Sequence, residues 1–319
     1  MKPTAPPIPT FVPLLVGMLA ISFSPILVRY SDAPVSIQGM YRMLFTFLLM
    51  LPFGVKSMPA FRRLTLKDWW LLFWAGFFLA LHFILWMASL TYTSIASSTI
   101  LLSLEPVFVM VGTFLIFKDR ASRMAIIGMV IALAGAILVG SGDMSVSREA
   151  VFGDLLSFLG TVAVAVNMLI AKQILTRVPA FLYSLIVFFF TFLCFLVYNL
   201  AMGIELTGYP RKDWIVFLLL AVIPTVFGHL VFNWLMQYVK ATTISMSVLA
   251  EPVGASLLGM LIFGEMVTGM QLFGGAFIIY GLYLYLRAER ADTGAVPMTE
   301  PAAAPDLAPS GPTPLSKEG

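Results

Sequence analysis

The sequence has few of the residues on which secreted proteins and soluble enzymes depend. Its one cysteine, Cys194, excludes an internal disulfide, and it has only two histidines, His82 and His229. Neither histidine belongs to an HExxH motif, so the sequence does not indicate a catalytic metal site. The chain also has no GxxxxGK[ST] phosphate loop, so ATP-driven pumping by this chain is not indicated. The net charge of +3 is too small to point to a nucleic-acid partner. We therefore expect no metal, no cofactor and no nucleic acid.

Charged residues are scarce as well. Only 11% of the 319 residues are charged and 60% are hydrophobic, whereas soluble domains have roughly 25% charged residues. A chain of this composition would expose too much apolar surface in water, but the lipid bilayer accepts such surface. The composition therefore indicates a polytopic membrane protein.

Ten apolar runs are separated by polar or charged breaks, and each approaches the roughly 20 residues that a helix needs to cross a bilayer. We expect an all-α membrane protein with ten transmembrane helices at residues 12–29, 36–55, 69–90, 94–117, 124–141, 153–172, 180–202, 213–236, 241–263 and 268–286. Residues 1–11 are expected to form a short N-terminal segment before a retained helix rather than a cleaved signal peptide. The Pro- and Ala-rich residues 287–319 are expected to form a disordered tail.

The distribution of lysine and arginine predicts the orientation. If the N-terminus is cytoplasmic, 14 of the 19 lysines and arginines fall in cytoplasmic segments, four fall in external segments, and Arg42 lies inside a span. This asymmetry follows the positive-inside rule. We expect both termini in the cytoplasm and a bacterial-type inner membrane as the location.

The chain contains an internal repeat at a shift of 146 residues. The first-copy residues that recur are Glu105, Pro106, Val107, Leu115, Ile116, Phe117, Met124, Gly128 and Gly135, and His82 matches His229 with one residue of slippage. Each copy has five spans, an odd number, so the second copy (153–286) is expected to enter the membrane from the opposite side to the first (12–141). Such inverted repeats are typical of secondary transporters, whose site lies near the midplane.

Two acidic residues, Glu105 and Glu251, lie deep within predicted spans. Each precedes a proline, Pro106 or Pro252, which removes a helix donor and is expected to kink the helix. A glutamate at that depth is costly unless it faces a polar interior. We interpret both as candidate substrate or proton sites. The alternative is a kinked helix whose glutamate bonds to a neighbouring helix.

Further polar and aromatic residues lie within the predicted spans. The additional candidates for a central cavity are His82, His229, Arg42, Trp86, Asn233 and Asn167. The histidines are candidates for proton relay or ligand contact, or for a hydrogen bond between helices. Arg42 is either a fixed counter-ion to one glutamate or a substrate contact. We also expect the serines and threonines of spans 94–117 and 241–263 to line this cavity.

Several segments resemble a known family. They are SFSPILVRYSD in the first span, MYRMLF around Arg42, HFILWMASLTYTSIASSTILLSLEPVF from His82 to Phe108, and GHLVFNWLMQYVKATTISMSVLAEPVGASLLGMLIFGE from Gly228 to Glu265. On these residues the chain resembles a ten-helix member of the drug/metabolite transporter superfamily, of the EamA type. The resemblance implies two inverted five-helix repeats around a central cavity, and a substrate among amino acids, nucleobases, drugs and other metabolites. The position of Glu105 is often glutamine in related sequences.

Three classes of function are compatible with the sequence. The first is a secondary-active exporter of a small organic metabolite or drug, amino-acid-like or otherwise amphipathic, with protons as the coupling ion. The second is an uncoupled facilitator of the same fold. The third, a membrane-embedded enzyme, is disfavoured because the spans contain no aspartate pair and no metal-binding set. The sequence is compatible with an oligomer.

Overall fold

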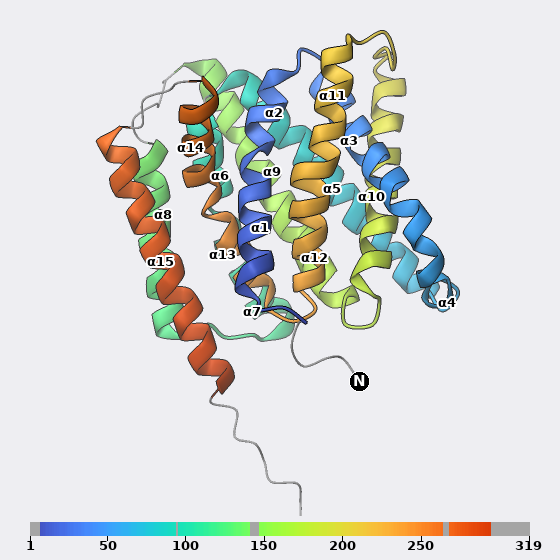
Figure 1. Cartoon of the computed structure of the whole chain (residues 1–319). Helices are drawn as coiled ribbons and strands as arrows, with labels where there is room; N and C mark the ends of the chain where they lie inside the picture. Colours follow the sequence, from blue (N-terminus) through green and yellow to red (C-terminus); the bar gives the residue numbers. More distant parts are fainter. Residues whose placement is uncertain (1–6, 94, 141–146, 264–267, 295–319) are drawn as a thin grey trace, which may run out of the picture.

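The computed structural model describes residues 7–93, 95–140, 147–263 and 268–294. Within these ranges every regular element is a helix, and Figure 1 shows the helices side by side in one bundle. The helix α1 begins and α15 ends at the same end of this bundle (Figure 1), as an even number of crossings requires.

The first repeat supplies five crossings, three of which consist of more than one helical element. They are α1 (Phe11–Ser22) with α2 (Ser24–Tyr30); α3 (Val35–Met50), continued by a 3-10 turn, η1 (Leu51–Ser57), and the short α4 (Met58–Phe61); α5 (Leu66–Tyr92); α6 (Ile95–Leu102) with α7 (Glu105–Phe117); and α8 (Arg123–Gly140).

The second repeat supplies five more crossings. They are α9 (Arg148–Ile174); α10 (Ala180–Ala201); α11 (Arg211–Leu220) with a π-helical stretch, η3 (Ala221–Leu230), and α12 (Val231–Leu235); α13 (Ala241–Val248) with α14 (Glu251–Phe263); and α15 (Gly269–Gly294).

Every predicted span therefore coincides with a crossing in the described residues. Nine crossings are long and apolar enough to span a membrane, and the tenth, at Arg123–Val139, is a shorter apolar helix. Among the predicted boundaries, the end of the last span differs most from the structure. The last helix, α15, continues to Gly294 instead of ending at 286, so residues 287–294 are helical rather than disordered. The expected disorder of residues 295–319 lies outside the described part.

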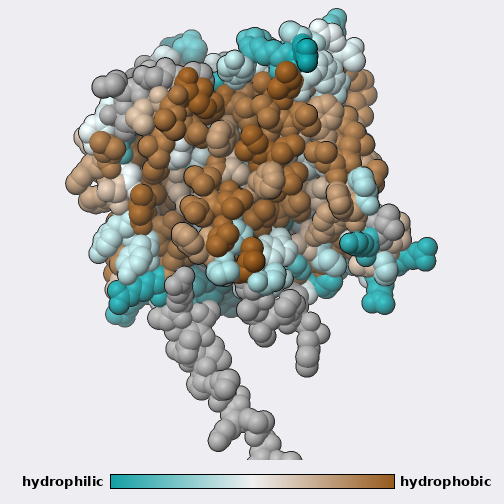
Figure 2. All heavy atoms as spheres, in the orientation of Figure 1, coloured by the Kyte–Doolittle hydropathy of each residue, from teal (hydrophilic) through white to brown (hydrophobic). Residues whose placement is uncertain are grey.

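The surface of the bundle is suited to lipid. Figure 2 shows a broad hydrophobic belt between hydrophilic ends. Large apolar side chains are exposed on several helices, for example Leu19 on α1, Leu218 on α11 and Phe227 on η3. An exposed apolar belt of this kind is what a hydrocarbon solvent accepts.

Helices α8 and α15 pack together at one side of the bundle (Figure 1). Their contact is made by glycines: a side chain at Gly128 would meet the backbone of Gly281, and a side chain at Gly135 would meet the backbone of Gly274. Small residues allow membrane helices to approach this closely. Because Gly128 matches Gly274 and Gly135 matches Gly281 in the repeat, the two contacts are equivalent across the two halves.

Each end of the bundle has a polar contact between one repeat and the other. At the start of α5, the buried Asp68 accepts hydrogen bonds from the Thr65 backbone, at 2.9 Å, and from Arg177 Nε, at 2.7 Å. At the start of α11, the buried Asp213 accepts a hydrogen bond of 2.8 Å from the hydroxyl of Ser31. In both cases an aspartate of one repeat binds the loop between the first two spans of the other. We call these two polar contacts the Asp68 contact and the Asp213 contact.

Candidate substrate site

The fourth and ninth crossings are broken at mid-length rather than merely kinked. Helix α6 ends at Leu102 and α7 begins at Glu105, while α13 ends at Val248 and α14 begins at Glu251. In place of the expected kink at each proline, a two-residue turn separates the two helices just before each Glu-Pro pair. The glutamate then lies in the first turn of a new helix, where the positive end of the helix dipole favours a carboxylate.

The two prolines also explain why these helices cannot run on. A proline has no N–H and collides with the carbonyl four residues earlier, which for Pro106 is that of Leu102 and for Pro252 that of Val248. Backbone without helical structure is tolerated in a membrane protein only where it is enclosed by protein or lines a polar cavity.

A cavity lies where these two breaks meet, and both Leu102 and Val248 line it. The centre of a water-sized sphere can occupy about 70 Å³ of it. The lining comes from the first, third and fourth crossings of each repeat, which are matched positions. Its polar and aromatic members are Ser24, His82, Phe83, Trp86, Glu105, Asn167, His229, Phe232, Asn233 and Glu251.

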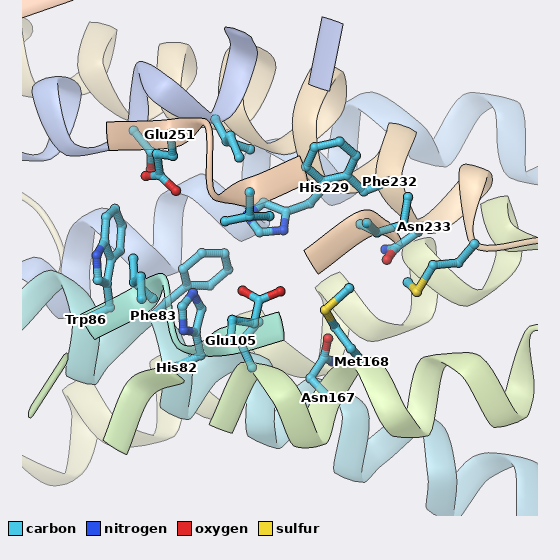
Figure 3. Close-up of a pocket in the computed structure, with 17 residues that line it drawn as sticks. His82, Phe83, Trp86, Glu105, Asn167, Met168, His229, Phe232, Asn233 and Glu251 are labelled. Carbon is cyan, nitrogen blue, oxygen red and sulfur yellow. The ribbon is translucent and has the colours of Figure 1, made fainter. Parts of the chain in front are cut away.

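The carboxylate of Glu105 points into the middle of this cavity, between the side chains of His82 and His229 (Figure 3). The residue is 3% exposed, and its Oε1 atom has no hydrogen-bond partner among the described residues. Glu251 reaches the same cavity from α14 and is 6% exposed. A buried carboxylate oxygen without a partner is costly, so a ligand or a proton bound there would relieve that cost.

The two histidines have different surroundings. His82 donates its Nδ1 proton to the carbonyl of Gly160 on α9, at 2.9 Å, which leaves Nε2 as an acceptor in the neutral ring. His229 lies at the end of the π-helical stretch η3, and its ring packs edge-on against Phe83 with centroids 5.2 Å apart. Stretches of π-helix occur often at functional sites.

Two amides and an indole complete the set predicted from sequence. Asn167 donates to the carbonyl of Ala75 at 2.8 Å, and Asn233 donates to the hydroxyl of Ser184 at 3.0 Å. The Trp86 ring lies parallel to that of His82 with centroids 6.2 Å apart. Its buried Nε1 donor has no acceptor among the described residues. The hydrogen bonds fix the two amides, whereas the indole N–H is available to a ligand.

Arg42 is the one predicted site residue that does not line the cavity. It is 0% exposed and lies behind Phe83, with its guanidinium carbon 4.2 Å from the ring centroid. Its Nε donates to Thr225 at 2.7 Å and its Nη1 donates to Ser24 at 3.2 Å. The described residues contain no direct ion pair between Arg42 and either glutamate. The guanidinium therefore acts on the cavity through its charge rather than through contact.

The expectation that the serines and threonines of the fourth and ninth spans line the cavity was wrong. Ser98 instead bonds to Ser89 and Ser157 on neighbouring helices, and Thr243 donates to Glu289 on α15. Hydroxyls of this kind join helices within a membrane. Conversely, Phe83, Phe232 and Ser24 line the cavity without having been predicted, because in so apolar a chain nothing distinguishes them from packing residues.

A two-repeat helical membrane fold with a polar cavity at its centre is the architecture of a membrane transporter. Two segments of the chain, residues 10–141 and 151–287, match the model of the EamA-like transporter family. The protein belongs to this family.

Several relatives of known sequence are also described as transporters. The chain is 27% identical over 243 residues to the uncharacterized transporter YetK of Bacillus subtilis, covering 74% of this chain and 73% of the relative. It is 22% identical over 282 residues to the uncharacterized transporter YdfC of the same bacterium, with 87% and 90% covered. An uncharacterized transporter of Archaeoglobus fulgidus is 25% identical over 252 residues, with 77% and 84% covered.

A solved crystal structure of another protein superposes on this chain with a TM-score of 0.74 at 15% identity. The match covers 88% of this chain and 98% of the other. At this identity the likeness concerns the fold alone.

Proposed function

We propose that this membrane transporter is a secondary-active exporter of a small organic solute, with protons as the coupling ion. The observation that supports this most directly is the cavity between the two repeats, which holds Glu105 and Glu251 on broken helices at mid-length. Transporters with inverted repeats and broken helices bind substrate and coupling ion at such a position. The resemblance to exporters of metabolites and drugs supports the direction.

The lining of the cavity suits a small amphipathic molecule. Three aromatic side chains, Phe83, Trp86 and Phe232, provide apolar contact, while amides and carboxylates provide hydrogen bonds. An inorganic ion would need a tighter cage of oxygen atoms.

The proposed mechanism is alternating access between the repeats. The matched contacts of α1 with η3 and α12 and of α5 with α9 would open in turn, exposing the cavity to one side and then the other. Proton binding at Glu105 or Glu251 would change the charge of the site and so favour one arrangement. We propose that the termini lie in the cytoplasm, on the basis of the lysine and arginine asymmetry.

The test is uptake and efflux in proteoliposomes, with a panel of radiolabelled amino acids, nucleosides and lipophilic cations, each with and without an imposed pH gradient. We expect at least one solute to move faster when the gradient is present. Movement that ignores the gradient would contradict proton coupling and support the second candidate, a facilitator of the same fold.

A further inference from the structure

The charged side chains that line the cavity are all acidic. Among the described lining residues the ionisable groups are Glu105, Glu251, His82 and His229, and no lysine or arginine is present. The cavity is enclosed by apolar helices, so charge within it is weakly screened. A ligand with a negative group would therefore face two carboxylates and no basic side chain.

One positive charge lies outside this lining and offsets part of the negative charge. Arg42, behind Phe83, is close enough to Glu251 for the two charges to attract. Glu105 and Glu251 repel each other when both are ionised. When both carboxylates are ionised, they and the one guanidinium leave one uncompensated negative charge, which a single monovalent cation would neutralise.

The positive ends of the half-helices do not provide an alternative site for an anion. The dipoles of α7 and α14 could in principle attract a substrate carboxylate, but each helix already has its own glutamate in its first turn. A zwitterionic amino acid would thus find a partner for its ammonium group but none for its carboxylate.

We propose that the transported solute is a monovalent organic amine with an aromatic or otherwise apolar body, and that its ammonium group and a proton compete for Glu105. The unpartnered Oε1 of Glu105 would accept from the ammonium, and the rings of Phe83, Trp86 and Phe232 would contact the apolar body of the molecule. This inference rests on the proposed transport function and specifies its substrate class.

Competition predicts how binding depends on pH. The titratable and charged groups that face Glu105 are His82 on α5, His229 on η3, Glu251 on α14 and, one layer behind, Arg42 on α3. As the pH falls, protons occupy the carboxylates, and any protonation of the histidines adds repulsion. Amine binding is therefore expected to weaken as the pH falls, by up to about tenfold per pH unit while one site titrates.

The experiment compares three probes that share a benzene ring: phenethylamine as cation, 2-phenylethanol as neutral analogue and 3-phenylpropionate as anion. Their affinities for the purified full chain in lipid nanodiscs are measured by calorimetry between pH 5 and 9. We expect phenethylamine to bind at least about tenfold more tightly than either analogue at pH 8, the difference shrinking at pH 5. An amine affinity that does not exceed that of the alcohol would overturn the proposal.

Variants make the test specific for Glu105. Glu105→Gln keeps the shape of the side chain, and we expect it to abolish the preference for the amine together with its pH dependence; Glu105→Asp should retain part of both. Glu205→Gln, at an exposed glutamate before α11, is the matched control and should behave as wild type. Unchanged amine preference in a folded Glu105→Gln protein would overturn the proposal.

Failure of the substrate class is distinguishable from failure of the transport function. Proton-stimulated movement of the neutral or anionic analogue in proteoliposomes would refute the amine while leaving proton-coupled transport in place. Binding of the amine without any gradient-stimulated movement would refute the coupling while leaving the site in place.

Discussion

Glu105 and Glu251 occupy equivalent positions in the two repeats, but their surroundings differ. Glu251 lies within the influence of Arg42, whereas Glu105 has a buried oxygen without a partner among the described residues. The repeat in the sequence predicted that both carboxylates would reach one cavity. It could not predict this difference, because Arg42 has no basic counterpart at the matching position of α10, where Phe188 stands.

The first prediction concerns Glu251→Gln. This variant leaves one carboxylate opposite Arg42, so the site no longer has an uncompensated charge for a proton to neutralise. We expect transport to lose its dependence on pH while the protein still folds, as judged by size-exclusion chromatography. Transport would be followed in proteoliposomes from pH 5 to 9. A variant that keeps the full wild-type pH profile would remove Glu251 from the proposed coupling.

The second prediction concerns Arg42. Arg42→Ala would leave a cavity and would deprive Thr225 and Ser24 of their donor, and the loss of a hydrogen bond from a charged group costs about 1.5–3 kcal/mol. We expect poor expression and a lower melting temperature in detergent. Arg42→Met, which restores most of the volume without the charge, should recover only part of the loss.

Exposed Arg63 provides the control: Arg63→Ala should melt like wild type. An Arg42→Ala protein that is as stable as wild type but has an altered substrate affinity would contradict the structural role of the guanidinium in joining Thr225 and Ser24. It would instead indicate that the guanidinium contacts the substrate directly.

At the scale of helices, the sequence predicted positions well and local geometry less well. The apolar runs identified all ten crossings because a helix in lipid needs a fixed length of apolar residues. The two-residue turns before Glu105 and Glu251 were not predicted, because a proline signals only the loss of a donor, and tertiary packing decides whether the helix bends or stops. The π-helical stretch around Pro224 was missed for the same reason.

The third prediction concerns the Asp68 and Asp213 contacts, which lie at opposite ends of the bundle. Hydrogen bonds to charged groups are worth about 1.5–3 kcal/mol, enough to shift a two-state equilibrium roughly tenfold or more. Under alternating access, Asp68→Asn should favour opening at the Asp68 end, and Asp213→Asn should favour opening at the other end.

Cysteine labelling can measure this shift. Cys194→Ala removes the natural thiol, and Val164→Cys then places a single thiol in the cavity lining. A membrane-impermeant maleimide is applied from either side of oriented vesicles, and the rate of labelling of this thiol is measured. We expect the two aspartate variants to raise labelling from opposite sides. Glu149→Gln, at an exposed acid in the first turn of α9, should change neither. Equal effects of both aspartate variants on both sides would contradict this assignment.

For the molecule as a whole, the two-copy organisation was the most informative feature of the sequence. It predicted which crossings would meet, and seven of the eight predicted site residues do line the cavity, the exception being Arg42. The exception has a physical cause: depth along a helix can be counted from the sequence, but the direction in which a side chain points around the helix axis depends on packing. Phe83 lies between Arg42 and the cavity, and nothing in the sequence marks it for that position.

The glycine contacts between α8 and α15 have a consequence for how the protein could be made. They bring the last helix of one repeat close to the last helix of the other. Together with the contacts of α1 with η3 and of α5 with α9, they could hold the two halves together without the peptide chain between α8 and α9. We expect two separately encoded polypeptides, one ending after α8 and one beginning before α9, to co-purify as a heterodimer when expressed together. Gly135→Leu should weaken their association, because it disrupts one of the contacts that join the two halves. Each polypeptide alone would hold one glutamate and one histidine, and the substrate site would form only on assembly.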